Sequence, residues 1–269
     1  MGLLSWRRWR RAPKRIAETV KAISCLHNWW DTVLRYTGLR KYEAGFEVVT
    51  RKGIRIRTSQ AAELVTVWTV WIRGEYSVPK GLPTVVDVGA NIGSFSILAA
   101  MRGASRVVAV EPASKTFAKL KANIELNHLE PVVQTVRAAI GGKSGRRTLF
   151  ISDNSPMTSF YCACVHGIER EETETLGLWD LCKNLQIQTI NLLKLDCEGA
   201  EYEIVESCRR ELLAKIERII LEYHANGDYK KLTNILKEAG FEIRRHISTG
   251  HRTGVIEFLR QGICWDPNT

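Results

Sequence analysis

The chain of 269 residues is predicted to form an α/β domain built on a doubly wound, mostly parallel sheet. Apolar strand-like runs alternate with helical patterns from Thr84 to Ile220, the order that builds parallel sheets. Hydrophobic residues make up 45% of the chain, which is enough for a large core. The final run, Val255–Leu259, alternates and predicts an antiparallel last strand. We divide the chain into a basic aromatic extension over residues 1–40, a pre-domain hairpin and helix over 41–80, and the α/β domain over 81–269.

Three elements are expected before the domain. A helix is predicted over Ala22–Trp30, because its apolar residues fall on one side. The segment Glu47–Arg57 alternates around Lys52-Gly53 and predicts a small hairpin. A helix over Ala61–Ile72 then leads to Tyr76.

Within the domain, short apolar runs predict strands, and helical spacing, as at Leu120 and Ile124, predicts helices. The expected strands are Thr84–Val88, Val107–Val110, Val132–Val136, one ending at Asp196, Arg218–Glu222, Phe241–His246 and Val255–Leu259. The expected helices are Gly93–Met101, Ser114–Asn127, Leu176–Leu185 and Tyr229–Ala239. A glycine-rich turn at 141–145 leads to an expected edge hairpin over Arg147–Tyr161.

The first strand of the domain ends in a glycine turn that is typical of a nucleotide-cofactor site. Gly89 permits a tight turn beside a ligand, and Gly93 starts a helix whose free amides can bind a carboxylate. Asp87 stands at the carboxyl end of the strand, where open α/β sheets hold ligands. The middle glycine of a GxGxxG fingerprint is missing, which disfavours a pyrophosphate. Glu111 ends the next strand and can accept hydrogen bonds from both ribose hydroxyls, so S-adenosylmethionine, with a ribose and no phosphate, fits best.

A third block, LLKLDCEGAE over residues 192–201, again runs from an apolar strand into acids. Together with VVDVGANIGSFS, VVAVEP and IILEYH, it resembles the FkbM-type methyltransferases over roughly Tyr76 to Phe258. That resemblance implies a Rossmann-like class I methyltransferase fold, and transfer of a methyl group from S-adenosylmethionine to hydroxyl groups, often on sugars or polyketide-like products. Cys197 departs from the apolar residue usual in the family and is expected to face the packing of the sheet. The resemblance also makes Tyr76 a candidate lid residue, because this region helps to cover the cofactor in the family; a packed linker aromatic is the alternative.

The resemblance and the motifs together nominate one set of cofactor-binding residues, with Asp196 and Glu198 beside the transferred methyl. The candidates for cofactor binding are Asp87, Gly89, Ala90, Asn91, Gly93, Ser94, Glu111, Pro112, Ala139 and Asp196.

Catalytic candidates follow two neighbouring strands. Asp196 and Glu198 come after one strand, and Glu222 and His224 come after the next. Methyl transfer to a hydroxyl needs alignment and removal of a proton, and a histidine with an ordinary pKa near 6.5 is well matched to that task at neutral pH. A buried carboxylate with a raised pKa could act instead, and polar turn residues without a catalytic role remain the alternative. Glu201 is expected to cap its helix.

Metal binding is compatible with the sequence but not required by it. The carboxylates and the imidazole could hold Mg²⁺ or Mn²⁺ with adjacent hydroxyls. Cys162, Cys164 and His166 lie too close together for an ordinary structural zinc site. Seven cysteines, an odd number, indicate reduced thiols in a cytoplasmic protein.

The net charge of +10 lies entirely in the N-terminal fifth of the chain. Residues 1–57 contain 14 Lys or Arg against 4 Asp or Glu, whereas residues 58–269 contain 25 of each. The pattern of residues 1–15 predicts a basic helix with tryptophans and peripheral contact with a membrane surface. A disordered or partner-bound arm and RNA binding are the alternatives. No signal peptide or membrane-spanning run is expected.

The sequence therefore predicts an O-methyltransferase acting on a small-molecule or glycan-like acceptor. An RNA or protein methyltransferase is the alternative within enzymes, although nucleic acid is disfavoured because the basic region is separate from the chemistry. A catalytically silent S-adenosylmethionine-binding module that acts through its basic arm is the alternative from another class.

Overall fold

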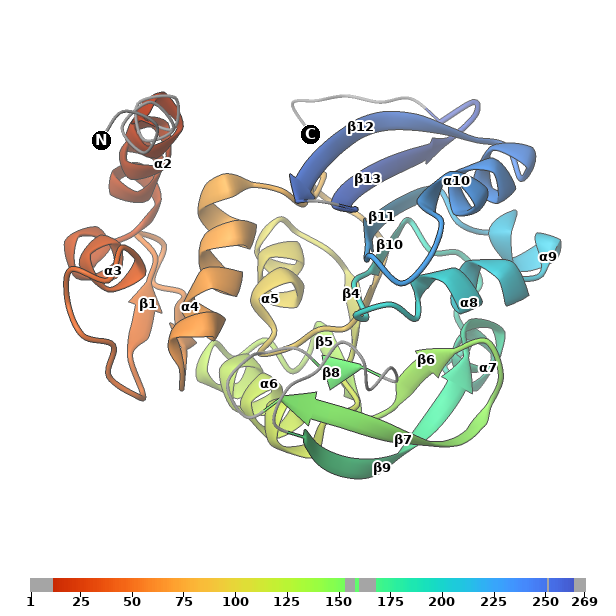
Figure 1. Ribbon diagram of the computed structural model, residues 1–269, viewed down its shortest axis with the longest axis horizontal. Coiled ribbons are helices and arrows are strands. Elements are labelled where there is room, and N and C mark those ends of the chain that lie inside the picture. Colours follow the sequence, from red (N-terminus) through yellow and green to blue (C-terminus); the bar gives the residue numbers. More distant parts are fainter. Residues whose placement is uncertain (1–11, 153–157, 160–167, 251, 264–269) are drawn as a thin grey trace, which may run out of the picture. The chain divides into compact units, whose positions relative to one another are not determined.

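The computed structural model describes residues 12–152, 158–159, 168–250 and 252–263 (Figure 1). The basic segment 1–11 and the Cys162, Cys164 and His166 group lie outside the described residues. The chain divides into two compact units, Met1–Gly74 and Glu75–Thr269. No helix of the described residues is long and apolar enough to cross a membrane.

The first unit combines short helices with one hairpin. Its elements are α2 (Ala12–Cys25), α3 (Trp29–Tyr36), β1 (Glu47–Val49), β2 (Arg55–Arg57), α4 (Ala61–Val67) and the π-helical turn η1 (Trp68–Arg73). The hairpin is antiparallel, as predicted. The predicted helix Ala22–Trp30 is wrong, because the chain breaks between α2 and α3 to contact β1. Leu26 forms a bridge with Thr50, and the Asn28 side chain bonds the backbone of Glu47 and Val49 at 2.7 and 2.9 Å.

The second unit is built on a seven-stranded sheet with the order β12-β13-β11-β10-β3-β4-β5. Its strands are β3 (Thr84–Val88), β4 (Arg106–Val110), β5 (Val133–Val136), β10 (Leu192–Leu195), β11 (Arg218–Tyr223), β12 (Phe241–Gly250) and β13 (Thr253–Arg260). Strand β13 is antiparallel to both of its neighbours, and the pairs from β11 to β5 are parallel. The predicted fold class, with its antiparallel last strand, is confirmed. Strand β13 lies between β12 and β11 inside the sheet, and nearly all of its residues are buried.

Helices connect these strands and cover the sheet. They are α5 (Ser94–Met101), α6 (Ser114–Leu126), α7 (Leu178–Asn184), α8 (Glu201–Ser207), α9 (Arg210–Leu213) and α10 (Tyr229–Glu238). Helix α5 packs on β3, β4 and β5, while α8 and α10 contact each other and pack on β11 and β12 respectively. The β-branched strands, with Val86, Val108 and Ile219 almost completely buried, form the centre of the core.

The predicted edge hairpin is part of a separate four-stranded sheet. Its order is β6-β9-β7-β8, with β6 (Ala139–Gly141), β7 (Gly145–Ser152), β8 (Thr158–Ser159) and β9 (Ile168–Gly177). Strands β7 and β8 do pair, but the main partner of β7 is β9, which was not predicted. Its buried residues Thr173 and Thr175 alternate with Glu172 and Glu174, so the strand resembles a polar loop in sequence.

The glycine turn after β3 lies directly against the end of β10. Gly89 has φ +76, and a Cβ added there would be 1.8 Å from the carbonyl oxygen of Asp196. Gly93 has φ +91, and its Cβ would be 2.8 Å from Leu120 of α6. Both glycines are therefore required by backbone conformation and by packing, in addition to any ligand that the turn holds.

We predict that Gly89→Ala lowers the free energy of unfolding by about 3 kcal/mol or more, because the methyl group collides with the backbone in a left-handed conformation. The control is Gly81→Ala, where φ is +66 but nothing lies within 4 Å of the added Cβ. This control should lose only about 1 kcal/mol. Urea unfolding followed by circular dichroism measures both. Equal losses would show that the contact with Asp196 is unimportant.

Candidate active site

The ends of four parallel strands meet at one edge of the large sheet. Val88 of β3 pairs with Val110 of β4 and with Leu195 of β10, which in turn pairs with Leu221 of β11. Strands β3, β4 and β10 end at this level, and β11 continues to Tyr223. This register brings the glycine turn, Glu111 and the acidic loops to one edge, as predicted for open α/β sheets.

Glu111 joins the glycine turn to the loop after β4. Its carboxylate accepts hydrogen bonds from the backbone N–H of Asn91 at 3.0 Å and of Ala113 at 3.1 Å. Asn91 itself is in the left-handed region, with φ +51, and its side chain accepts from the N–H of Ile92. Burial raises the pKa of Glu111 to about 7, against the two backbone bonds that lower it. The carboxylate keeps lone pairs for a ligand hydroxyl.

The other predicted cofactor residues have different surroundings. Asp87 is completely buried, and its carboxylate accepts from Ser96 Oγ at 2.6 Å. Ala90 and Ser94 are buried, whereas Pro112 is half-buried. Ala139 begins β6 in the four-stranded sheet and is 4% exposed. Asp87 and Ala139 thus have little surface for a ligand.

A buried lysine that sequence reasoning missed lies at the centre of the site. Lys194 Nζ is 3.0 Å from Asp87, 3.5 Å from Asp196 and 3.1 Å from the carbonyl oxygen of Gly89. Burial opposes its charge, but Asp87, Asp196 and Glu222 raise the pKa of Lys194 above its ordinary value. The signal was present in the sequence, because a lysine inside a short apolar strand needs a partner when the strand is buried.

Tyr76 connects two of the predicted catalytic acids. Its hydroxyl donates to Asp196 at 3.2 Å and also bonds Glu222. The ring packs edge-on against Phe95, with 6.0 Å between centroids. Burial and the neighbouring Asp196 raise the pKa of Glu222 to about 8. Tyr76 is therefore a buried residue that positions carboxylates.

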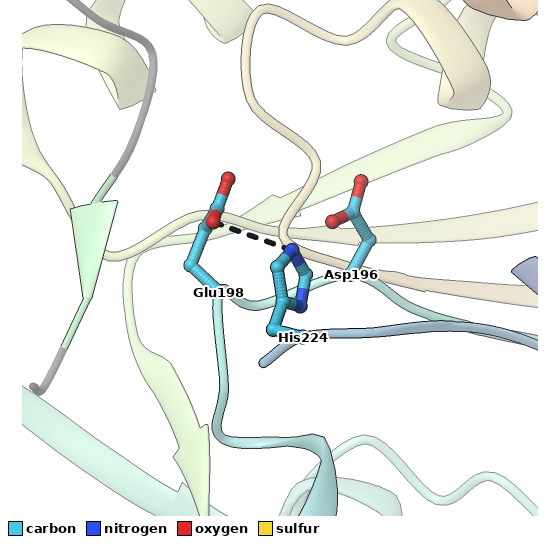
Figure 2. A group of neighbouring side chains, drawn as sticks. All are labelled: Asp196, Glu198 and His224. Carbon is cyan, nitrogen blue, oxygen red and sulfur yellow. Dashed lines mark ion pairs between the residues drawn. The ribbon is translucent and has the colours of Figure 1, made fainter. Parts of the chain in front are cut away.

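His224 lies beside Glu198 of the loop that follows β10 (Figure 2) and beside Glu201, the first residue of helix α8. Its Nε2 is 3.3 Å from Glu198 and its Nδ1 is 3.3 Å from Glu201. Glu201 is completely buried and accepts from the backbone N–H of Cys197 and Gly199 at 2.7 and 2.9 Å. Glu201 thus holds the loop before its helix and orients His224, a role beyond the predicted cap.

The expectation that His224 is the general base does not agree with its surroundings. Burial alone would lower the pKa of His224, but Glu201, Glu198 and Asp196 raise it to about 10. At neutral pH this imidazole is protonated and has no lone pair to accept a proton. Burial, Asp196 and Glu201 raise the pKa of Glu198 to about 7, although His224 opposes them. Cys197 packs against the core, as expected.

Sequence comparison now identifies the kind of protein. A sequence model described as "Methyltransferase FkbM domain" matches residues 87–243, more than half of the chain. The chain belongs to the FkbM methyltransferase family. The resemblance seen in the motifs is thereby confirmed, and the matched segment contains the glycine turn, Glu111 and the acids after β10 and β11.

Curated relatives of this FkbM methyltransferase are distant but share most of their length with it. Methyltransferase sdnD of Sordaria araneosa is 25% identical over 194 residues, which cover 61% of this chain and 75% of that protein. Hexuronic acid methyltransferase AglP of Haloferax volcanii is 27% identical, with 64% and 72% covered. The 31-O-demethyl-FK506 methyltransferase FkbM of Streptomyces tacrolimicus is 26% identical, with 59% and 72% covered. The chain is thus a methyltransferase.

Proposed function

We propose that this methyltransferase binds S-adenosylmethionine against the Gly89–Gly93 turn and Glu111. The methyl group passes to a hydroxyl oxygen of a small-molecule or glycan-like acceptor beside Asp196 and Glu222. The observation that carries this proposal is the contact between Gly89 and the carbonyl of Asp196, because it puts a cofactor-type turn next to the acids. The names of AglP and of the Streptomyces FkbM describe a sugar acid and a small molecule as acceptors, which supports this acceptor class.

The reaction requires alignment and the removal of one proton. The acceptor hydroxyl loses its proton to a carboxylate, and its oxygen attacks the methyl carbon in line with the sulfur. The carbon–sulfur bond breaks, and its electron pair stays on sulfur to give S-adenosylhomocysteine. Glu222 is our candidate for the base, since its carboxylate is held by Tyr76 beside Asp196.

An RNA or protein acceptor has less support. The surplus of basic residues lies within residues 1–57, while 58–269, which include the whole sheet and its acids, have equal numbers of both charges. Binding of nucleic acid depends mainly on cations near the phosphates, and the described active-site edge is rich in carboxylates instead.

The proposed reaction predicts that labelled methyl from S-adenosylmethionine enters small hydroxylated molecules of a fractionated extract as an alkali-stable ether. Asp196→Asn should lower the rate by about 100-fold or more, because alignment and proton transfer both depend on this loop. Glu206→Gln, an exposed glutamate on α8, is the matched control and should keep the wild-type rate. Label recovered in RNA or protein would contradict the proposed acceptor class, and no transfer at all would favour a silent binding module.

Glu111 predicts a pH-dependent affinity for the cofactor. A carboxyl whose pKa is raised to about 7 is neutral below that pH, and the ionised form is the better acceptor for two ribose hydroxyls. The dissociation constant of S-adenosylmethionine should therefore rise up to about tenfold from pH 8 to pH 6. Calorimetry on wild type and Glu111→Gln separates this effect from titration of the ligand, because the variant should lose the dependence. An equal pH dependence of the dissociation constant in both proteins would show that Glu111 does not bind the cofactor.

We further propose that the first unit docks on an anionic membrane surface. Ile16, Val20 and Ile23 fall on one face of α2 and are 65%, 60% and 38% exposed. Arg15 and Lys21 of the same helix are exposed, and segment 1–57 carries 14 basic against 4 acidic residues, a surplus that complements anionic lipid. An apolar stripe flanked by cations is the arrangement that binds in the interface of a bilayer.

Val20→Glu should weaken binding to phosphatidylserine vesicles by about fivefold or more, because it removes buried apolar area and adds a negative charge. Val65→Glu is the matched control, since Val65 is also an exposed apolar residue on a helix of this unit. Vesicle co-sedimentation at two salt concentrations measures both variants. Equal effects, or equal binding to neutral vesicles, would contradict the docking face.

A further inference from the structure

Three side chains of the active site converge with the donors that a divalent cation needs. One oxygen of Asp196, one oxygen of Glu198 and one ring nitrogen of His224 all lie within 4.8 Å of one another. Figure 2 shows that they come from the loops after two neighbouring strands and point to the same region. All three are half-buried. Two oxygens bound to the same Mg²⁺ are at most about 4.2 Å apart, so small shifts of these side chains bring the three donor atoms within binding distance of one ion.

The second ring nitrogen of His224 has a carboxylate beside it at ion-pair distance. Metal-bound histidines usually direct their second ring nitrogen to a carboxylate, which sets the tautomer and the orientation of the ring. Here Nδ1 of His224 faces Glu201 at 3.3 Å, and Nε2 faces the open group. Glu201 lies outside the converging group, is completely buried, and is fixed by two backbone amides. This support is independent of the two carboxylate donors and leaves Nε2 as the ligand atom.

Carboxyl groups outnumber cationic side chains at this edge. Asp196, Glu198, Glu201 and Glu222 lie close to Lys194 and His224, and Lys194 is already bonded to Asp87 and Gly89. Oxygen donors with a single imidazole suit Mn²⁺ or Mg²⁺.

We propose that Asp196, Glu198 and His224 bind a divalent cation of the Mn²⁺ or Mg²⁺ type, which holds the methyl acceptor through two adjacent oxygens. The role of the cation in holding the methyl acceptor rests on the proposed function. Three protein ligands leave open positions on a six-coordinate ion, and two neighbouring oxygens of a diol or a 2-hydroxy acid can occupy them. The cation would orient the acceptor and make its hydroxyl more acidic before the methyl transfer described above.

The cation site is tested without turnover. The full chain is treated with EDTA and titrated with Mn²⁺, and the free ion is followed by electron paramagnetic resonance. We expect one saturable site per chain. Glu198→Gln and Glu201→Gln should each lower Mn²⁺ affinity by about 10–100-fold, the first as a ligand and the second through the orientation of His224. Glu206→Gln should bind like wild type, and circular dichroism shows that each variant is folded.

The absence of a saturable site, or an equal loss in Glu206→Gln, would overturn the cation site. For the acceptor, Mn²⁺ should stimulate methyl transfer to adjacent diols or 2-hydroxy acids by about tenfold or more and leave isolated alcohols unaffected. Equal stimulation of both would overturn binding through two oxygens. Failure of the proposed function has a different signature, namely a chain that binds one Mn²⁺ but neither S-adenosylmethionine nor any acceptor.

Discussion

The buried ion pair of Lys194 with Asp87 is the interaction on which the active site depends. The lysine is 3% exposed and the aspartate is fully buried, so each would be an uncompensated charge in the core without the other. Lys194 lies on β10 and Asp87 on β3, and the same ammonium also bonds Gly89. The pair therefore sets the end of one strand against the end of the other, and with it the glycine turn against the acidic loop.

This arrangement brings several carboxylates close together, and their proximity shifts the pKa values of the groups in the site. Once Lys194 is committed to Asp87, the acids beyond the sheet share few positive charges. Burial and the neighbouring Asp196 raise the pKa of Glu198 and Glu222, while Glu201, Glu198 and Asp196 raise the pKa of His224 against its burial. The site thus combines carboxyl groups that have raised pKa values with a histidine beside buried Glu201.

Residue types and spacing predicted which residues gather at one edge of the sheet. They did not predict which groups each side chain contacts. The register of the parallel strands brings Glu111, Asp196 and His224 to one edge, as strand order implies. Asp87 serves Lys194 and Ser96 inside the core, and Ala139 belongs to a second sheet. These differences arise because the direction of a side chain and its pKa depend on neighbours that are distant along the chain.

The periodicity of apolar residues along the chain was sufficient to predict the order of strands and helices of the large sheet, because apolar runs and glycine turns are local signals. It was insufficient for β9, whose buried threonines look like loop residues, and for the break after α2, where Asn28 bonds β1. The contact of Gly89 with Asp196 joins residues more than a hundred positions apart. Only the folded chain brings such groups together, and burial there changes their charges.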